Sequence, residues 1–360
     1  MIYGSYQHRR DDKERAELAI IMTSFPKLTM RSVYLLLMSM LVSSVNAQPD
    51  TTYAERLGFP RGKKVIVLHV DDAGMSYEAN QGTKRALDEG IAVSTSVMMP
   101  CNWVPHFMTY AGQKRNLDVG VHLTLTSEWS AYRWSPLTGQ KTGLCDPQGA
   151  FWPSVKDVVA HASPEEVEAE VRAQLARFRA FGLEPTHLDS HMGTLFQLKF
   201  LPVYVKVGIE QKIPILFPGG HATLVTQTEK LPDDQLVLVR KVGKQLWAAG
   251  LPVFDDLDGS SYGWNLPEGT PVTDKALQTM KTQKYIDLLT RCRPGLTYVI
   301  MHCAQSTPQF GQVTNSWATR QGDMLAMLDP ALKAYIEREG IIVTTCRELM
   351  ERRKKAGNTH

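Results

Sequence analysis

Carboxylate and imidazole side chains recur at the ends of four apolar segments of this 360-residue sequence. Such side chains bind divalent transition metals and exchange protons near neutral pH, so a cluster of them could activate a water molecule. Two imidazoles and one carboxylate would leave positions open at a metal for water and substrate. The residues concerned are Asp71, Asp72, His122, His187, Asp189, His191 and His302.

Asp71 and Asp72 are neighbours at the end of the apolar run 64–70. Neighbouring side chains on an extended strand point to opposite faces, so both can serve one site only where the backbone turns. At such a turn, one carboxylate could bind a metal while the other accepts a proton from water. Two ionised carboxylates repel each other, but the charge of a metal counters this repulsion for its own ligand.

His187 and His191 are four residues apart, a spacing with different consequences on a helix and on a strand. On a helix both rings could reach one metal, whereas on a strand they would be about 13 Å apart. Because 186–189 is predicted to be a strand, we expect one ligand here. His191, past the strand end, is favoured; His187 is expected to pack within the strand and Asp189 to orient a ligand imidazole. No such context surrounds His69, His106, His161 or His221, which are interpreted as ordinary.

Short apolar runs alternate along the chain with segments of helical periodicity. The run 64–70 is continuously apolar, as in a strand that is buried on both faces. Ser163 and Pro164 begin a helix as N-cap and first residue, and Gly182 ends it. Strands are predicted at 64–70, 93–99, 118–125, 186–189, 213–217, 253–257, 296–302 and 341–345, and helices at 77–87, 105–113, 164–181, 273–291 and 323–338.

This alternation predicts an α/β fold with a mainly parallel sheet, and seven or eight such units favour a distorted (β/α) barrel. We expect a single domain with long loop excursions at 126–160 and near 218–270. In a parallel barrel the carboxyl ends of the strands meet at one face, where the loops build the active site. Four separate strands would thus deliver the ionisable residues to one rim.

Three motifs carry a resemblance to a known family. They are His-Val-Asp-Asp-Ala-Gly-Met-Ser at 69–76, Gly-Val-His-Leu-Thr-Leu-Thr at 120–126 and Thr-His-Leu-Asp-Ser-His at 186–191. In this order and spacing they resemble the metal-site motifs of the YdjC-type carbohydrate deacetylases, which are chitooligosaccharide deacetylase-like members of the polysaccharide deacetylase superfamily. The similarity extends from about Lys64 to Leu349. It implies a distorted (β/α) barrel that removes acetyl groups from N-acetylated sugars and releases acetate and an amino sugar.

The resemblance also implies roles for particular residues. It assigns metal binding to Asp72, His122 and His191. It implies that Asp71 is the general base and His302 the general acid. The implied cofactor is one divalent metal ion, Mg²⁺ or Zn²⁺, and the implied partner is an acetylated sugar or oligosaccharide.

The sequence departs from the family pattern in two places. Many relatives continue after Asp-Ser-His with further histidines, whereas Met192 and Gly193 follow His191 here. The late histidine is commonly followed by Pro-Gly, and here by Cys303 and Ala304. The expected metal ligands are all retained, but the substrate of the chitobiose-type members does not carry over directly.

Aromatic residues crowd both predicted excursions. Sugars present apolar C–H faces that stack on aromatic rings, so a saccharide cleft is one interpretation, and packing of the loops is the other. Trp129 and Trp134 in the first excursion and Trp264 in the second are the predicted substrate-binding residues.

Two other functions are compatible with the same residues. A non-catalytic saccharide-binding protein of this fold would be expected to lack a ligand or the base, and neither is missing. A metal-dependent esterase, or an amidase with another substrate, would use the same site, because a fold and a metal do not define a substrate.

The amino-terminal 47 residues are interpreted as an extension with an export signal. Lys27 and Arg31 precede the apolar run 33–45, and Ala47 ends a segment suited to signal peptidase. The run is too short for a stable membrane span, although an anchor or a buried helix is the alternative. We expect 1–47 to be removed, 48–360 to form the carbohydrate deacetylase domain, and the mature protein to be secreted or periplasmic.

Composition narrows the possible partners. The net charge is +3, with both signs mixed along the chain and no basic run interleaved with aromatics, so nucleic acid is not an expected partner. A homo-oligomer is compatible with the sequence. The five cysteines are widely spread and include no CxxC pair, which favours buried thiols, with one disulfide as the alternative.

Overall fold

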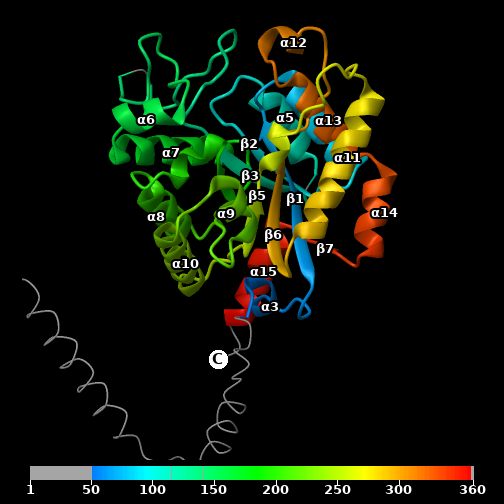
Figure 1. Ribbon diagram of the computed structural model, residues 1–360. Helices are drawn as coiled ribbons and strands as arrows, with labels where there is room; N and C mark the ends of the chain where they lie inside the picture. The colour runs from blue at the N-terminus through cyan, green and yellow to red at the C-terminus, as the bar shows by residue number, and fades with distance from the viewer. Residues whose placement is uncertain (1–50, 115, 140, 358–360) are drawn as a thin grey trace, which may run out of the picture. The chain divides into compact units, whose positions relative to one another are not determined.

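Seven parallel strands form the sheet that carries the candidate site. The computed structural model describes residues 51–114, 116–139 and 141–357 (Figure 1). The strand order is β4-β3-β2-β1-β6-β5, and β7 pairs with the first half of β1. Because every pairing is parallel, the carboxyl ends of the strands meet at one rim. The strands are β1 (Lys64–Ala73), β2 (Ser94–Val97), β3 (Asp118–Leu123), β4 (Leu188–Ser190), β5 (Asp256–Asp258), β6 (Gly295–Met301) and β7 (Ile342–Val343).

The segment 214–222 connects the two edges of this sheet. Its backbone amides donate to the Leu188 carbonyl of β4 and to the Asp255 carbonyl just before β5, both at 2.8 Å. The sheet therefore curls into a distorted barrel, which confirms the predicted fold class. The strand predicted at 213–217 is wrong: Ile215 makes only an isolated bridge, because the chain crosses from one edge to the other instead of running along β4.

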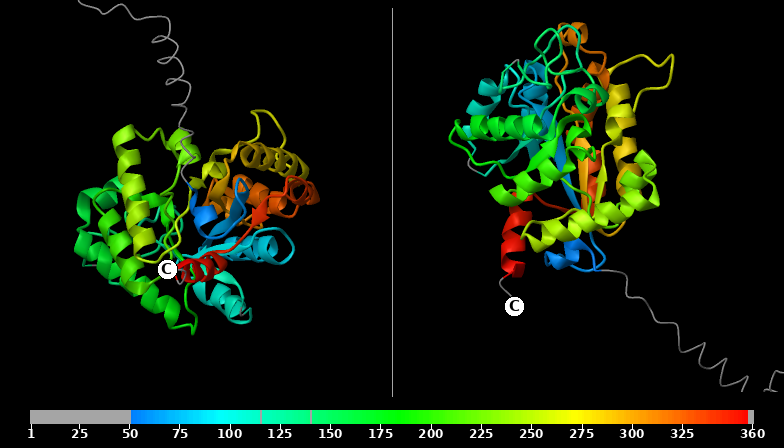
Figure 2. Two further views of the ribbon diagram at one scale, coloured as in Figure 1. Left: turned by 90° about the horizontal axis from the view of Figure 1, so that it is seen from below. Right: turned by 90° about the vertical axis from the view of Figure 1, so that its left-hand side faces the viewer.

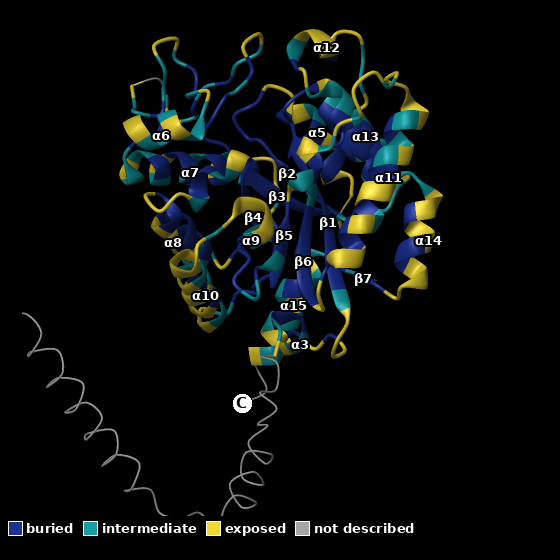
Figure 3. Ribbon diagram, in the orientation of Figure 1, coloured by how far each residue is buried: buried dark blue, intermediate teal, exposed yellow. Residues whose placement is uncertain are grey.

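Helices cover the outer face of the sheet with their apolar sides turned inward (Figure 3). The helix predicted after Ser163 is present. The Ser163 hydroxyl accepts a hydrogen bond from the Glu166 amide at 3.2 Å, as part of a capping box. The helices of the described residues are α3 (Tyr53–Arg56), α4 (Tyr77–Asp88), α5 (Val104–Gly112), α6 (Val155–His161), α7 (Pro164–Arg179), α8 (Leu201–Gln211), α9 (Thr223–Glu229), α10 (Asp233–Ala248), α11 (Asp274–Arg291), α12 (Phe310–Val313), α13 (Trp317–Met327), α14 (Pro330–Arg338) and α15 (Cys346–Gly357), with 3-10 helices η1 (His191–Phe196) and η2 (Ser260–Gly263).

Two further predictions need correction. The helix predicted over 323–338 is two helices, α13 and α14, and Asp329 caps the second, which begins at Pro330. Proline has no backbone N–H for the preceding helix but suits a first helical position. The excursion near 218–270 is not simply a loop, because it contains α9, α10, β5 and η2.

Helices α3 and α15 close the amino-terminal end of the barrel, as Figure 2 shows from below. The Asp118 carboxylate at the start of β3 accepts the amides of Cys346 (3.0 Å) and Arg347 (2.8 Å), so it caps α15. Asp255 accepts the Tyr53 amide at 2.8 Å and fixes α3 in the same manner. These two helices cover the end of the barrel that lies opposite the carboxyl rim and its ionisable residues.

The predicted signal segment, 1–47, lies outside the described residues. Among the residues that are described, no helix is long and apolar enough to cross a membrane. All five cysteines are free thiols; four of them are buried, as predicted, whereas Cys145 is only partly buried.

Candidate metal and catalytic site

The five predicted ligand and catalytic residues lie together at the carboxyl rim. Asp72 has a φ of 67°, in the left-handed region, and the pairing of β1 with β2 shifts register between Val70 and Ala73. This bulge is the backbone turn that two neighbouring carboxylates require. Asp71 and Asp72 consequently both approach the same imidazole, at 3.8 and 3.2 Å from His122 Nε2.

Asp72, His122 and His191 form a triangle of possible ligand atoms. Asp72 Oδ1 lies 3.2 Å from His122 Nε2 and 3.2 Å from His191 Nδ1, and these two nitrogens are 3.3 Å apart. Bonds of about 2.1 Å to one transition metal place its ligand atoms roughly 3.0–3.4 Å apart, so the triangle fits a single ion. Asp72 Oδ1 is also a buried oxygen with no hydrogen-bond partner among the described residues, as expected of a ligand atom.

Each imidazole of the triangle is fixed by a carboxylate on its other nitrogen. Asp189 Oδ1 lies 2.6 Å from His122 Nδ1, and Glu128 Oε2 lies 3.1 Å from His191 Nε2. In a neutral imidazole, an N–H held in this way leaves the opposite nitrogen unprotonated for a metal. Asp189 thus occupies the orienting position expected from the sequence, whereas Glu128 was not predicted.

The chain turns sharply after His191. Met192 (φ 51°) and Gly193 (φ 64°) are both left-handed, so the strand does not continue past β4 (Leu188–Ser190). His187 lies just before this strand and His191 just after it. His187 Nε2 has no hydrogen-bond partner in the described residues and lies 4.0 Å from Asp189 Oδ2, away from the triangle. Burial lowers the pKa of His187 to about 4. The geometry therefore favours His191 as the ligand, in line with the prediction from spacing.

Asp71 lies between the triangle and His69. Its Oδ1 is 3.0 Å from His69 Nε2, which is also 3.0 Å from Asp189 Oδ2. Burial alone would lower the pKa of His69, but the Asp189 and Asp71 carboxylates outweigh it and raise that pKa. His69 therefore links the predicted base to the orienting carboxylate, and its interpretation as an ordinary histidine was wrong.

His302 faces Asp71 across a short gap. Its Nε2 lies 3.9 Å from Asp71 Oδ2, too far for a hydrogen bond between the two groups. Its backbone amide donates to Asp323 Oδ2 at 3.0 Å, and the Tyr262 ring packs against the imidazole with 5.1 Å between ring centres. Burial lowers the pKa of His302, an effect partly opposed by the Asp72 carboxylate.

Arg320, on α13, completes the surroundings of Asp72. Its Nη1 donates to Asp72 Oδ2 at 2.7 Å, and both side chains are buried. Burial alone would raise the pKa of the Asp72 carboxyl, but the Arg320 guanidinium and the two imidazoles hold it well below its usual value. Asp72 therefore remains ionised, as a metal ligand must be.

The imidazoles of His122 and His191, the two candidate ligands, lie in a strongly negative environment. Burial alone would lower the pKa of His191, but Glu128 and Asp72 outweigh it and raise the value to about 9. Burial likewise opposes protonation of His122, but the Asp189 and Asp71 carboxylates raise its pKa well above the usual value. A metal would therefore compete with protons for both rings.

The three predicted sugar-binding tryptophans differ in position. Trp129 and Trp134 lie beside the site but are only 6% and 3% exposed. The Trp129 ring lies 5.6 Å from the Arg320 guanidinium, and the Trp134 and His191 rings are 6.3 Å apart. These contacts favour a supporting role, because little ring face is open. Trp264 lines a separate cavity, so sugar binding by all three stays a prediction.

The contacting residues that were not predicted include His69, Glu128 and Arg320. The position of His69 could have been predicted from the sequence. It is two residues before Asp71, and side chains two residues apart on a strand lie on the same face. Glu128 is 63 residues from His191, and Arg320 is 248 residues from Asp72. No local pattern relates residues at such separations.

Known proteins are similar to this chain in sequence and in fold. A carbohydrate deacetylase of Thermus thermophilus is 32% identical over 283 residues, which cover 78% of this chain and 92% of that protein. A chitooligosaccharide deacetylase of Yersinia enterocolitica is 30% identical over 283 residues, which cover 77% of this chain and 96% of that protein.

The fold is shared with a crystal structure of an Enterococcus faecalis protein named for cellobiose-phosphate cleavage. The two superpose with a TM-score of 0.62 at 21% identity, covering 80% of this chain and 99% of that one. The family described as YdjC-like protein matches residues 65–338, most of the chain. On this match and the identity to full-length relatives, the chain belongs to the YdjC-like protein family.

Proposed function

We propose that this protein is a metal-dependent carbohydrate N-deacetylase, which hydrolyses the acetamide bond of N-acetylated sugars. The observation that carries the proposal is the triangle of Asp72, His122 and His191, in which a carboxylate fixes each imidazole. The names of the two deacetylase relatives support the substrate class.

A divalent metal held by Asp72, His122 and His191 would supply a Lewis acid that polarises the acetamide carbonyl and lowers the pKa of water. Two imidazole ligands favour Zn²⁺, and Mg²⁺ is the alternative. Arg320 keeps the Asp72 carboxylate ionised and in place through its 2.7 Å hydrogen bond.

Asp71 and His302 provide the proton transfers in this proposal. Asp71 Oδ2 faces the site and accepts a proton from the attacking water, while His69 Nε2 lies 3.0 Å from the other oxygen. Water adds to the carbonyl carbon, and the carbon–nitrogen bond then breaks. His302 Nε2, across the 3.9 Å gap, delivers a proton to the departing amine. Acetate and an amino sugar are the products.

Tyr262 offers the open aromatic surface next to this chemistry. It is 42% exposed and packs against His302. Met192, directly after His191, is 49% exposed on the same rim. We expect the apolar face of a sugar ring to lie on Tyr262, with its acetamide group directed toward Asp71.

A panel of acetylated compounds tests the proposal. Acetate release is measured from N-acetylglucosamine, N-acetylated chitooligosaccharides, an O-acetylated sugar and a simple acetate ester, before and after chelation and with Zn²⁺ or Mg²⁺ restored. We expect metal-dependent release from the N-acetylated sugars. Preferential hydrolysis of the esters would favour the esterase alternative, and sugar binding without any release would favour a non-catalytic saccharide-binding protein.

We also propose that the protein is exported after cleavage near Ala47, on the basis of the amino-terminal sequence. Amino-terminal sequencing of the protein from its native host should give a start at or near Gln48, in the secreted or periplasmic fraction. A full-length cytoplasmic form would contradict this.

A further inference from the structure

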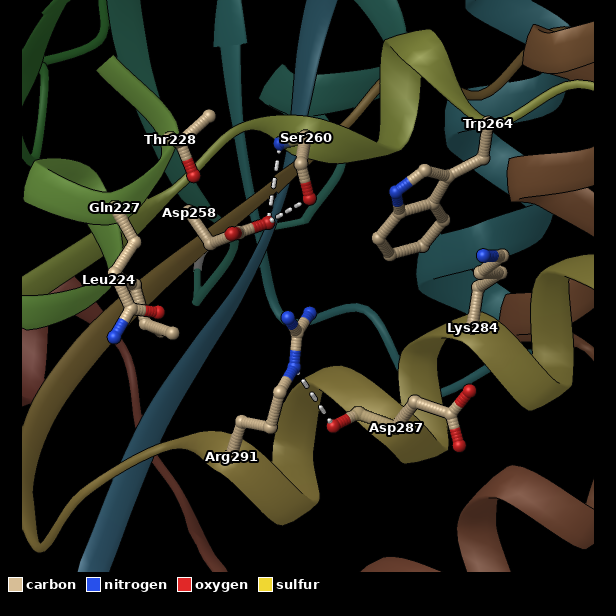
Figure 4. A pocket seen from close by; sticks show the side chains of 9 residues that line it. All are labelled: Leu224, Gln227, Thr228, Asp258, Ser260, Trp264, Lys284, Asp287 and Arg291. Atoms are coloured by element: carbon tan, nitrogen blue, oxygen red, sulfur yellow. Dashed lines mark hydrogen bonds between the residues drawn. The ribbon is translucent and has the colours of Figure 1, made fainter. Parts of the chain in front are cut away.

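A cavity lies apart from the candidate active site. Its volume is about 560 Å³, within the range of roughly 300–1,000 Å³ that is usual for small-molecule pockets. Three parts of the chain line it: α9, the region from β5 through η2 to Trp264, and α11 (Figure 4). None of its lining residues belongs to the proposed ligands or proton-transfer groups.

The cavity is on the outer, helix-covered side of the sheet. Leu257 of β5 packs inside the barrel with Val67 and Tyr298, so its neighbour Asp258 points to the opposite side. Asp258 thereby forms the floor of the cavity. The sheet itself separates this floor from the interior that holds His69 and the other buried groups.

Charged side chains of both signs surround Asp258. Lys284, Asp287 and Arg291 are spaced three and four residues apart, so they share one exposed face of α11. The Arg291 Nε donates to the Asp287 carbonyl at 3.4 Å, and neither Arg291 nor Lys284 has an ion pair within the described part of the chain. Their charges are therefore free to meet a ligand.

Asp258 is only 4% exposed, yet part of its carboxylate is unused. The amide and the hydroxyl of Ser260 donate to the same oxygen, Oδ1, at 3.1 and 2.7 Å. Figure 4 shows these two bonds and the carboxylate directed into the cavity. Burial raises the pKa of Asp258. The other oxygen remains available to accept a hydrogen bond from a ligand.

Trp264 supplies an aromatic wall. The indole makes an edge-on contact with the Tyr285 ring, with 4.9 Å between ring centres. The Lys281 ammonium lies 5.5 Å from the centre of the indole, so two neighbouring side chains hold it in place. Figure 4 shows the ring extending over the space between Asp258 and Lys284. A half-buried indole held in this way offers a flat apolar surface beside polar groups.

We propose that this cavity binds a sugar ring, so that the protein carries a saccharide site in addition to its active site. The C–H face of a pyranose would lie on Trp264, Asp258 would accept from ring hydroxyls, and Arg291 would donate to others. Charges of both signs that are not paired with each other match a ligand rich in donors and acceptors better than a simple anion or cation. The proposal does not depend on the deacetylase reaction.

Equilibrium binding of three probes to the full-length protein tests this site. The probes are N-acetylglucosamine, glucosamine and, as a zwitterion without a ring, glycine; tryptophan fluorescence and isothermal titration are the readouts. We expect both sugars to bind and to change the fluorescence, and glycine not to bind. Trp264→Phe should abolish the change, whereas Trp103→Phe, which alters an exposed tryptophan outside the cavity, should retain it.

Two further variants separate this cavity from the active site. Arg291→Ala should weaken sugar binding about tenfold or more through loss of charge-assisted hydrogen bonds, and Arg338→Ala on α14 is the matched control. Asp72→Asn, which impairs the proposed metal site, should keep the fluorescence change. Loss of all sugar binding in Asp72→Asn, an effect of Arg291→Ala below twofold, or equal binding of glycine would each overturn the proposal. None of these results depends on acetate release, so failure of the proposed reaction remains distinguishable.

Discussion

Charged side chains cluster both at the carboxyl rim and in the cavity on the outer side of the sheet, which we call the outer cavity. The two regions differ in whether these charges are paired within the protein. At the rim each charge meets a partner within the protein: Arg320 binds Asp72, and carboxylates bind His122 and His191. In the outer cavity, Arg291 lacks an ion pair among the described residues.

Burial explains the difference. A buried charge without a partner costs several kcal/mol, so the rim can hold its groups only as a connected network. That network fixes the directions of the ligand atoms before a metal or substrate binds. Lys284, Asp287 and Arg291 of the cavity are exposed and need no such partner, because water solvates their charges. The rim is therefore suited to chemistry that needs fixed geometry, and the cavity to recognition by adjustable side chains.

The largest expected effects come from substituting the two neighbouring carboxylates of the rim, Asp71 and Asp72, and the two substitutions should differ in what they impair. Asp71→Asn retains an oxygen acceptor but loses the basic group, so turnover should fall about 10²–10⁴-fold while bound metal is retained. Asp72→Asn should instead lose metal, and excess metal should partly restore its activity. Turnover and metal content of both variants, measured at several metal concentrations, make the comparison. If Asp71→Asn is the metal-depleted variant that excess metal rescues, the two roles must be exchanged.

Two lysines of α11 test whether a charged side chain needs an ion-pair partner only when it is buried. Lys281 is fully buried, and its ammonium donates to the Ser261 carbonyl (2.6 Å), the Thr319 hydroxyl (2.7 Å) and Asp323 Oδ1 (2.8 Å). Lys281→Met should lower the free energy of unfolding by roughly 3–5 kcal/mol, because it leaves the Asp323 charge unpaired. Lys284→Met, one turn along on the exposed side, should change it by less than about 0.5 kcal/mol.

Chemical denaturation of the two lysine variants and the parent gives these values. Similar effects of both substitutions would show that the paired and unpaired regions do not differ in the way proposed.

The sequence predicted the positions of the rim residues better than their contacts. Asp71, His122 and His302 follow or end apolar runs, and the parallel-strand rule then places them at one rim. That rule says nothing about Arg320, which reaches Asp72 from a helix 248 residues away. Nor could it reveal that Trp129 is covered, because burial depends on the path of an irregular loop.

Some errors in the fold were avoidable, and others were not. Asp329 followed by Pro330 has the pattern of an N-cap and a first helical residue, so the break between α13 and α14 could have been predicted. The segment 213–217 is apolar in the manner of a strand, and only the closure of the barrel shows that it crosses between two edges. Local pattern cannot contain that information.

The carboxylates behind the ligand imidazoles should have a smaller effect than the ligands themselves. Glu128→Gln keeps a hydrogen-bonding group beside His191 Nε2 but removes its charge, so metal affinity should fall about 10–100-fold. Asp189→Asn should act similarly through His122. Competition with a chromophoric chelator measures the affinity, and Glu168→Gln on the surface of α7 is a matched control. An affinity unchanged by Glu128→Gln would remove Glu128 from the site.

A further prediction concerns the release of protons when metal binds at the rim. The pKa of His191 is raised to about 9 and that of His122 is also raised, because carboxylates surround both rings, so we expect protons to compete with a metal for both rings near pH 7. A metal requires their unprotonated nitrogens, so binding near pH 7 should release protons, and release should diminish as the pH rises past about 9. Affinity should increase about tenfold per pH unit for each proton released. Isothermal titration of chelator-treated protein in buffers of different ionisation enthalpy counts these protons. Sugar binding in the outer cavity, titrated in the same buffers, provides the comparison, and metal binding without proton release near pH 7 would show that the carboxylates do not charge the imidazoles.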